Sequence, residues 1–324
     1  MMDWFEQKQR EIANRAKKRY DKASRNIDAR MRRYLKQNQK VSDDLMASVS
    51  DGEISEREFK KQMNAKLFSG KKWTAEKEKQ AEILYEANRD CIYDLNESMD
   101  DLYIESYNRE SYATEKHYLR DIGMTLMTVE LLNQLKKKGK VEIPYKTVDR
   151  AKDMAWNVQR IQREVTNAVE VGTGMLGIWK NALTGVSKRG LNDIKNVIDY
   201  STRSVRAMGE YESMLEAEKL GIEIEKEWIS TLDLHTRETH RDLDGQRQAL
   251  HDPFEVDGYE LMYPRDPNGE PEMIINCRCT MKRIYPKYEN IPKERRENLK
   301  RTGESENKII PATTYREWEK SKHD

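Results

Sequence analysis

The sequence predicts an α+β protein in which a long, mostly helical N-terminal region precedes a small α+β C-terminal module. Charged residues make up 36% of the 324 residues and hydrophobic residues only 36%, below the roughly 45–50% apolar content of an ordinary globular domain. The mean hydropathy is −1.00. Apolar residues recur at helical spacing up to Gly221, and from Ile222 onward that spacing is lost while proline and glycine become frequent. Long helices that bury one narrow apolar stripe account for the low apolar content.

The helices of the N-terminal region are identified by apolar spacing and by their start and stop signals. In chain order, the expected helices are residues 4–39, a segment between a capping box at Ser55 and Gly70, residues 74–135 with an interruption at Gly123, residues 148–171 with Gly172 as C-cap, residues 175–183 and residues 191–220. Breaks are expected around residues 41–44, at Asp51-Gly52, across a basic connector at residues 136–144, and at residues 185–190.

Short strand-like pieces follow the helical region. They lie at residues 222–232, 258–262 and 273–285, and Pro267-Asn268-Gly269 is typical of a hairpin turn. The sequence therefore predicts three parts. These are an elongated helical interaction region at residues 1–221, an α+β module at residues 222–285, and a charged, loosely ordered and partly helical tail at residues 286–324.

The charge is balanced overall and uneven locally. The net charge of +1 creates no global field toward nucleic acid or a membrane. Residues 7–40 are rich in lysine and arginine, whereas residues 90–105 are acidic. Solvated helix faces explain both segments; the alternative is that the basic helix contacts nucleic acid or docks on a partner ring.

No segment predicts membrane insertion or export. No apolar run approaches the roughly twenty residues of a membrane span, and residues 122–135, which come nearest, contain polar residues and predict a packed helix. The first residues lack the layout of a signal peptide, so we expect a cytoplasmic protein at synthesis. Three cysteines, two of them one residue apart, favour metal ligands or ordinary thiols over a disulfide framework.

A histidine in the module is placed where it can act as a metal ligand. A strand carrying Trp228 leads to Asp233, and Thr236 is expected to cap a short helix that Asp244-Gly245 ends. His240 follows Thr236 by four residues and so lies one turn along the same helix face.

Two cysteines approach from a later segment, Asn276-Cys277-Arg278-Cys279. In a strand, Cys277 and Cys279 point to the same side. Together with His240 they supply three ligands for tetrahedral zinc. The fourth ligand is Asp233, Asp244 or His235, and the sequence does not choose among them.

Two other interpretations of these residues stay open. In the first, both cysteines are small buried residues in a strand, and His240 is hydrogen-bonded to Asp233 or Asp244. In the second, the carboxylates, the histidine and a metal form the site of a hydrolase or nuclease. The tail after Tyr285 is too short and polar for a separate catalytic fold, so we expect no enzymatic activity.

The block from Trp228 to Cys279 resembles the C-terminal domain of phage head morphogenesis proteins related to the F protein of phage Mu. The resemblance covers about residues 221–285. The matching positions, in fixed order, are Trp228, Asp233, Thr236, Arg237, His240, Leu243, Asp244, Gly245, Pro253, Phe254, Gly258, Tyr263, Pro264, Asp266, Pro267, Asn276, Cys277, Arg278 and Cys279.

The resemblance implies a minor capsid protein of a tailed bacteriophage. Such a protein is expected to join the procapsid with the portal protein, and to contact scaffold or major capsid protein. It is expected to remain in the virion, inside the head near the portal, and to act in DNA packaging or ejection. Non-specific contact with DNA fits the basic helix.

Overall fold

The computed structural model describes residues 3–118, 121–171, 175–286 and 315–322. Its contacts divide the chain into two compact units. The first unit contains Met1–Asn96 and Lys146–Ile198, and the second contains Glu97–Tyr145 and Asp199–Asp324. Helices α4 (Gly70–Tyr118) and α7 (Met175–Lys219) each contribute to both units.

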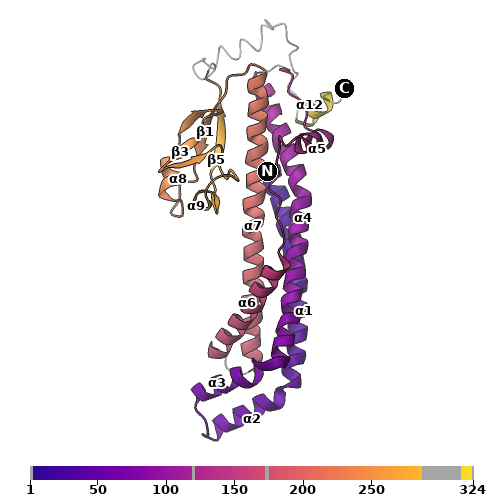
Figure 1. Ribbon diagram of the computed structural model, residues 1–324, viewed down its shortest axis with the longest axis vertical. Coiled ribbons are helices and arrows are strands. Elements are labelled where there is room, and N and C mark those ends of the chain that lie inside the picture. The colour runs from indigo at the N-terminus through magenta and orange to yellow at the C-terminus, as the bar shows by residue number, and fades with distance from the viewer. Residues whose placement is uncertain (1–2, 119–120, 172–174, 287–314, 323–324) are drawn as a thin grey trace. The chain divides into compact units, whose positions relative to one another are not determined.

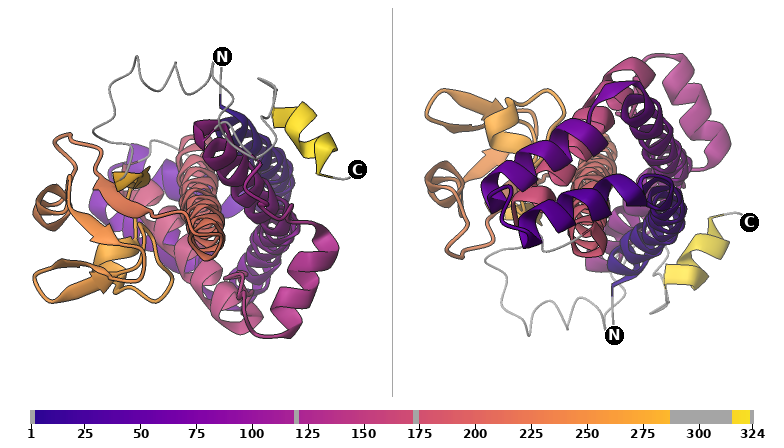
Figure 2. Two further views of the ribbon diagram at one scale, coloured as in Figure 1. Left: turned by 90° about the horizontal axis from the view of Figure 1, so that it is seen from above. Right: turned by 90° about the horizontal axis from the view of Figure 1, so that it is seen from below.

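The first unit is helical throughout most of its described residues. It consists of α1 (Trp4–Gln37), α2 (Gln39–Ser50), α3 (Glu56–Leu67), the first half of α4, α6 (Arg150–Val171) and the first part of α7. Helix α1 runs beside α4 in Figure 1, and α2 lies against α3 in the right-hand view of Figure 2.

Helix α1 forms because its apolar residues fall on one face. Its buried positions, spaced three or four residues apart, include Ile12, Ala16, Tyr20, Ala23, Ile27 and Met31. The Arg19 guanidinium binds Asp94 of α4 at 2.7 Å, and Arg30 binds Glu76 at 2.7 Å. Part of the basic N-terminal segment therefore pairs with acidic residues of α4.

Two of the expected breaks in the first unit are wrong. The chain turns at Asn38 and not at residues 41–44, which lie inside α2, where Ser42 and Leu45 are buried. Residues 185–190 lie inside the continuous helix α7. The glycines there do not break the helix but leave room for neighbouring side chains: an added Cβ on Gly190 would lie 2.7 Å from Tyr20 Cε1. The expected helix start at Ser55 is confirmed, since the Ser55 hydroxyl accepts a hydrogen bond from the Glu58 amide as an N-cap. Gly172 lies outside the described residues.

The second unit joins the other halves of α4 and α7 to shorter elements. Helix α5 (Val129–Lys137) begins later than expected: Gly123 has φ +83, and residues 121–128 are not helical because their amides bind side chains of α4. Glu115 accepts from the amides of Ile122 and Met124, and Asn108 accepts from that of Met127. Helix α12 (Tyr315–Ser321) belongs to the described part of the tail, whereas residues 287–314 lie outside the described ranges.

The α+β module follows α7. Its elements are β1 (Glu225–Ile229), α8 (Glu238–Asp242), β2 (Arg247–Ala249), β3 (Phe254–Val256), β4 (Tyr259–Leu261), α9 (Pro271–Ile274) and β5 (Thr280–Ile284). Strand β1 lies between β2 and β5 in an antiparallel sheet, and β3 and β4 form a hairpin. The fold class is thereby confirmed as a mostly helical N-terminal region followed by short strands and helices.

The turn chemistry of the module differs from expectation at one position. Pro267-Asn268-Gly269 is a turn, with the Gly269 amide bound to the Asp266 carbonyl at 2.9 Å, but it connects β4 to α9 and so is not a hairpin turn. The hairpin turn is Asp257-Gly258, where both residues have positive φ. The sequence contains Asp-Gly there, which is a stronger hairpin signal.

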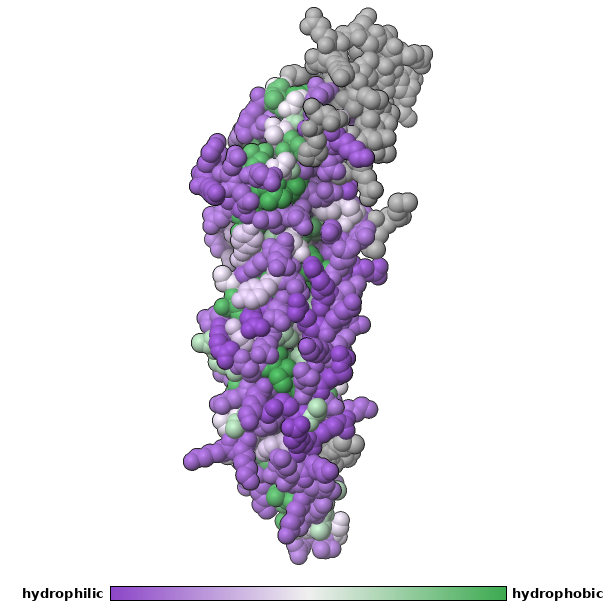
Figure 3. Space-filling view, turned by 90° about the vertical axis from the view of Figure 1, so that its right-hand side faces the viewer, coloured by the Kyte–Doolittle hydropathy of each residue, from purple (hydrophilic) through white to green (hydrophobic). Residues whose placement is uncertain are grey.

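The face of the protein that Figure 3 draws is mostly hydrophilic, with small, separate hydrophobic areas. None of the described helices has the length and apolar character that a membrane span requires.

Candidate metal centre

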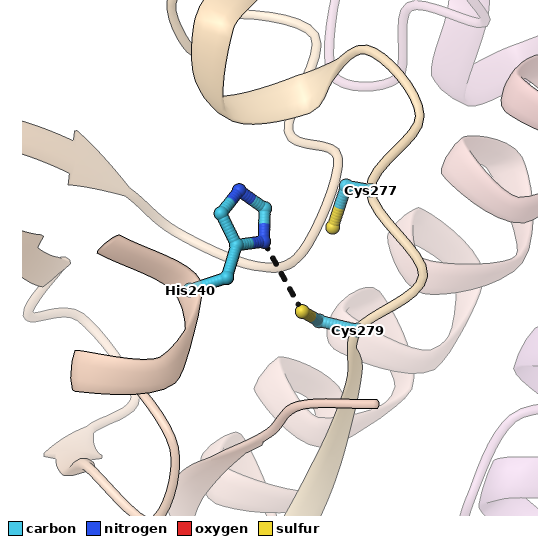
Figure 4. Close-up of side chains that lie close together, drawn as sticks. All are labelled: His240, Cys277 and Cys279. Atoms are coloured by element: carbon cyan, nitrogen blue, oxygen red, sulfur yellow. Dashed lines mark hydrogen bonds between the residues drawn. The ribbon is translucent and has the colours of Figure 1, made fainter. Parts of the chain in front are cut away.

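Three buried side chains meet at one point of the module. His240 lies on α8, and Cys277 and Cys279 lie in the segment between α9 and β5. Their exposed fractions are 2–3%, and their ligand atoms lie within 4.8 Å of one another. Figure 4 shows the His240 ring directed toward Cys279, with the Cys277 sulfur beside it. The sequence prediction that these three residues converge is therefore confirmed.

The cysteines reach this point by a route that differs from the expected strand. Strand β5 begins at Thr280, after both cysteines. Asn276 has φ +57, a left-handed conformation that asparagine tolerates better than most residues. The backbone turns there, and both thiols face the interior because they join the same core as Trp228 and Leu243.

Hydrogen bonds fix the proton positions on His240. Arg237 Nη1 lies 3.0 Å from His240 Nε2, and Cys279 Sγ lies 3.2 Å from Nδ1. Because a guanidinium only donates, Nε2 must accept. In a neutral ring the proton then resides on Nδ1 and is donated to Cys279. His240 is thus bonded to Arg237 and Cys279, and not to Asp233 or Asp244 as one interpretation of the sequence held.

The two thiols differ in acidity. A hydrogen bond from Cys277, followed by those with His240 and Ser230, lowers the pKa of Cys279 despite its burial. The same bond to Cys279, together with burial, raises the pKa of Cys277. The arrangement therefore favours one thiolate and one thiol, and the thiolate is the form that binds metal ions.

The three residues open onto a cavity of about 500 Å³, within the size range of small-molecule sites. Its wall comes from α7, from α8 with the loop before it, and from the segment between α9 and β5. The lining residues are Asp199, Thr231, His235, Thr236, Arg237, His240, Asn276, Cys277, Arg278 and Cys279.

The candidates for a fourth ligand have different surroundings. Asp233 binds Arg278 through both oxygens, one of them 2.6 Å from Nη2, and that guanidinium lowers the pKa of the carboxyl. Asp244 Oδ1 accepts from the Ser230 amide at 2.8 Å. His235 lines the cavity. The identity of the fourth ligand stays a prediction.

The remaining motif residues hold the segments around the cavity together. The Trp228 indole is buried and donates to Ser230 Oγ at 3.0 Å, while the Gly245 amide binds the Trp228 carbonyl at 2.8 Å. Thr236 is not the helix cap: the N-cap of α8 is Arg237, and Thr236 Oγ1 bonds instead to the Asp233 amide at 3.1 Å.

Two residues of the site had no signal in the sequence that pointed to them. Ser230 bonds to Cys279 Sγ at 3.5 Å and donates to the His240 carbonyl. Arg265 is 2% exposed and interacts electrostatically with both cysteines. Both residues lie inside the block from Trp228 to Cys279 but outside its matching positions, and their spacing from His240 and the cysteines does not predict such a contact.

Comparisons with known proteins confirm the resemblance noted in the sequence. Residues 159–282 match the family described as Phage Mu protein F like protein. The NAD(+)--arginine ADP-ribosyltransferase EFV of Enterococcus faecalis is 37% identical over 102 residues, which are 32% of this chain and 20% of the transferase. Minor head protein GP7 of Bacillus phage SPP1 is 24% identical over 241 residues, 70% of this chain and 71% of GP7. No solved structure matches the chain.

Proposed function

Because residues 159–282 form a Mu F-like domain, we propose that this chain is a minor head protein of a tailed bacteriophage. The similarity to GP7 carries the proposal, since it extends beyond the domain and covers 71% of a protein that is itself a minor head protein. In this role the chain joins the portal protein during procapsid assembly in the host cytoplasm, contacts scaffold or major capsid protein, and remains inside the head near the portal.

Association with the portal is the direct test. The full chain is co-expressed with the tagged portal protein of the same phage, and the portal is purified at several salt concentrations. We expect the chain to co-purify with that portal and not with the portal of an unrelated phage. Absence of association at every salt concentration would contradict the proposed assembly role.

A DNA contact is proposed for the exposed face of α1, in support of packaging or ejection. Exposed basic residues lie on the face opposite the buried stripe, three or four residues apart except for an interval of eight between Arg25 and Arg33. They are Arg15, Lys18, Lys22, Arg25, Arg33 and Lys36. A row of cations with this spacing suits a phosphate backbone, whose recognition depends on charge and not on base sequence.

We further propose that His240, Cys277 and Cys279 hold a zinc ion. Tetrahedral zinc, with bonds of about 2.0–2.3 Å, places its ligand atoms about 3.6–3.8 Å apart, so groups within 4.8 Å of one another need only small movements. The ring nitrogen of His240 that takes the zinc exchanges its hydrogen bond to Cys279 or Arg237 for the metal. The soft sulfur and imidazole donors match zinc. When bound, zinc supplies a cross-link between α8 and the segment that precedes β5.

Metal content and thermal melting test this site. Purified wild-type protein is expected to contain stoichiometric zinc, and Cys277→Ser and Cys279→Ser are each expected to lose it and to melt at a lower temperature. Cys91→Ser is the matched control, because Cys91 is buried on α4 and belongs to the other unit. Wild-type protein without zinc, or unchanged melting in both site variants, would exclude the site.

The proposed role of the centre is structural and not catalytic. Asp233 is held by Arg278 and Asp244 by the Ser230 amide, so the carboxylates that a hydrolase or nuclease needs already have protein partners. The match to EFV spans a fifth of that enzyme. We expect neither DNA cleavage in the presence of divalent metals nor consumption of NAD⁺ with an arginine acceptor. Either activity, if abolished by His240→Ala, would establish the enzymatic alternative.

A further inference from the structure

Glu115 is a fully buried acidic residue near the end of α4. Its side chain is 0% exposed, and both of its oxygens accept hydrogen bonds from residues outside that helix. Burial of a carboxylate is strongly unfavourable unless hydrogen bonds and a counter-charge replace the lost water. The groups that bind Glu115 therefore meet one shared requirement, and they come from two segments that lie far apart in the sequence.

The first segment is the non-helical stretch between α4 and α5. The Ile122 and Met124 amides donate to Glu115 Oε1 at 3.2 and 3.0 Å. The Met124 side chain is buried in a core with Met214 of α7 and Ile224, which precedes β1, and Ile122 packs against that core. The path of this stretch therefore contributes to the packing between α7 and the start of the module.

The second segment is α12. Trp318 Nε1 donates to Glu115 Oε2 at 2.6 Å, and Lys322 Nζ donates to Glu115 Oε1 at 2.9 Å. The Lys322 ammonium also donates to Asp121 Oδ1 at 2.8 Å, and the same oxygen accepts from the Gly123 amide at 2.9 Å. The Lys322 side chain is 11% exposed, so it brings a largely buried positive charge to Glu115. Helix α12 and the stretch between α4 and α5 thus share two acceptors, Glu115 and Asp121.

We propose that Glu115 couples the two segments, so that α12 is a strap whose docking stabilises the conformation of the stretch between α4 and α5. Release of α12 takes the indole donor and the positive charge away from a carboxylate that stays inside the protein. The amides alone do not offset that burial, so movement of residues 122–124 to admit water becomes easier. By thermodynamic linkage the coupling is reciprocal: loosening this stretch weakens the docking of α12 by the same factor.

Amide hydrogen exchange in the full chain tests one direction of the coupling. Trp318→Ala is expected to release α12 and to accelerate exchange at the Ile122 and Met124 amides about 5–150-fold, the typical range of coupling between sites. The Met127 amide, which binds a side chain of α4 at 2.8 Å, is the internal reference and is expected to keep its protection. Lys320→Ala changes an exposed residue of α12 and is the matched control, with wild-type exchange expected at all of these amides.

Two glycine variants test the reverse direction. Gly123 lies in the stretch before α5 and Gly139 lies beyond α5, with φ of +83 and +65. Outside their chain neighbours, no described residue has an atom within 4 Å of a Cβ added to either glycine. Alanine at either position therefore strains the backbone without a steric clash. Gly123→Ala is expected to accelerate exchange in Tyr315–Ser321, whereas Gly139→Ala imposes a similar strain beyond α5 and is expected to leave that exchange unchanged.

The outcomes separate the coupling from the docking contacts. Release of α12 by Trp318→Ala without faster exchange at Ile122 and Met124 would overturn the coupling alone. Retained protection of α12 in that variant would overturn both. Equal exchange of Tyr315–Ser321 in the two glycine variants, whether accelerated or not, would also overturn the coupling. If Gly123→Ala does not fold, Gly123→Asn imposes a smaller strain, because asparagine tolerates the left-handed region better, and its exchange decides in the same way.

Discussion

Lys226 shows how a single buried charge makes stability depend on pH. Its ammonium group is enclosed in the module, donates to the Met262 carbonyl at 2.8 Å, and lies 5.2 and 5.0 Å from the ring centroids of Tyr211 and Phe254. Burial lowers the pKa of Lys226 to about 8. In the unfolded chain a lysine has a pKa of about 10.4. The folded protein therefore binds fewer protons at this site between those two values.

We predict that Lys226 adds stability as the pH rises from about 8 toward 10.4. In that window the unfolded state binds more protons, so unfolding becomes less favourable with increasing pH. Lys226→Met removes this dependence. Melting temperatures of wild type and variant are compared between pH 7 and 10, and the difference, wild type minus variant, is expected to become more positive. Parallel curves across this range would show that Lys226 does not titrate as its environment indicates.

At the residue scale, the sequence identified ligands better than it identified their surroundings. The convergence of His240 with Cys277 and Cys279 followed from the family-like motif and helical spacing. The proton on His240 Nδ1 did not, because it depends on Arg237 donating to Nε2. The route of the cysteines depends on a left-handed residue, Asn276, which alternation along an assumed strand cannot reveal.

Helix α7 illustrates why glycine is ambiguous at the scale of an element. Glycine in a sequence favours a helix break, but it also permits close approach of two helices. An added Cβ on Gly209 would lie 2.7 Å from the Tyr103 carbonyl of α4 and 3.0 Å from Ser106 Cβ. Around Gly177, by contrast, no described residue beyond the adjoining turns of the helix has an atom within 4 Å of such a Cβ. Only the tertiary neighbours distinguish the two cases.

We predict opposite effects for two alanine substitutions in α7. Gly209→Ala forces the α4 backbone to shift and is expected to destabilise the protein by about 1–3 kcal/mol, as overpacking does. Gly177→Ala meets no obstacle and is expected to stabilise it by up to about 1 kcal/mol through helix propensity. Urea denaturation measures both. Stabilisation by Gly209→Ala would refute the close contact between α4 and α7.

Helix α12 depends on its docking contacts, because seven residues are too few for a stable isolated helix. Trp318 is buried and donates to Glu115 Oε2 at 2.6 Å, and Lys322 binds Glu115 Oε1 at 2.9 Å. We predict that Trp318→Ala releases α12, and that amide hydrogen exchange increases in Tyr315–Ser321 while β1 and β5 keep their protection. Lys320→Ala, at an exposed position, is the control and is expected to leave exchange unchanged. Retained protection of α12 in Trp318→Ala would contradict this docking.

At the scale of the whole molecule, local periodicity predicted most elements but not how they combine. The helices and the change of character near Gly221 could be inferred because each depends on neighbouring residues. The two compact units could not, since each joins distant segments through α4 and α7. The boundary between a helical region and a module at Gly221 stays a prediction, and it coincides with the interval between α7 and β1.

The balance of charge over the whole chain determines how a DNA contact can arise. With a net charge of +1, the chain has no overall attraction to DNA, so affinity must come from a local row of cations such as that on α1. We predict that changing Lys18, Lys22 and Arg25 to glutamine weakens binding to duplex DNA. The salt dependence, which is the slope of log K against log salt concentration, is expected to become shallower by about 0.9 for each phosphate that the variant no longer neutralises.

Changing Lys137, Lys138 and Lys140 to glutamine removes the same charge at other positions and is expected to leave the slope unchanged. Fluorescence anisotropy with labelled duplex DNA measures both variants, and an equal weakening in the two would assign binding to net charge and not to the row on α1.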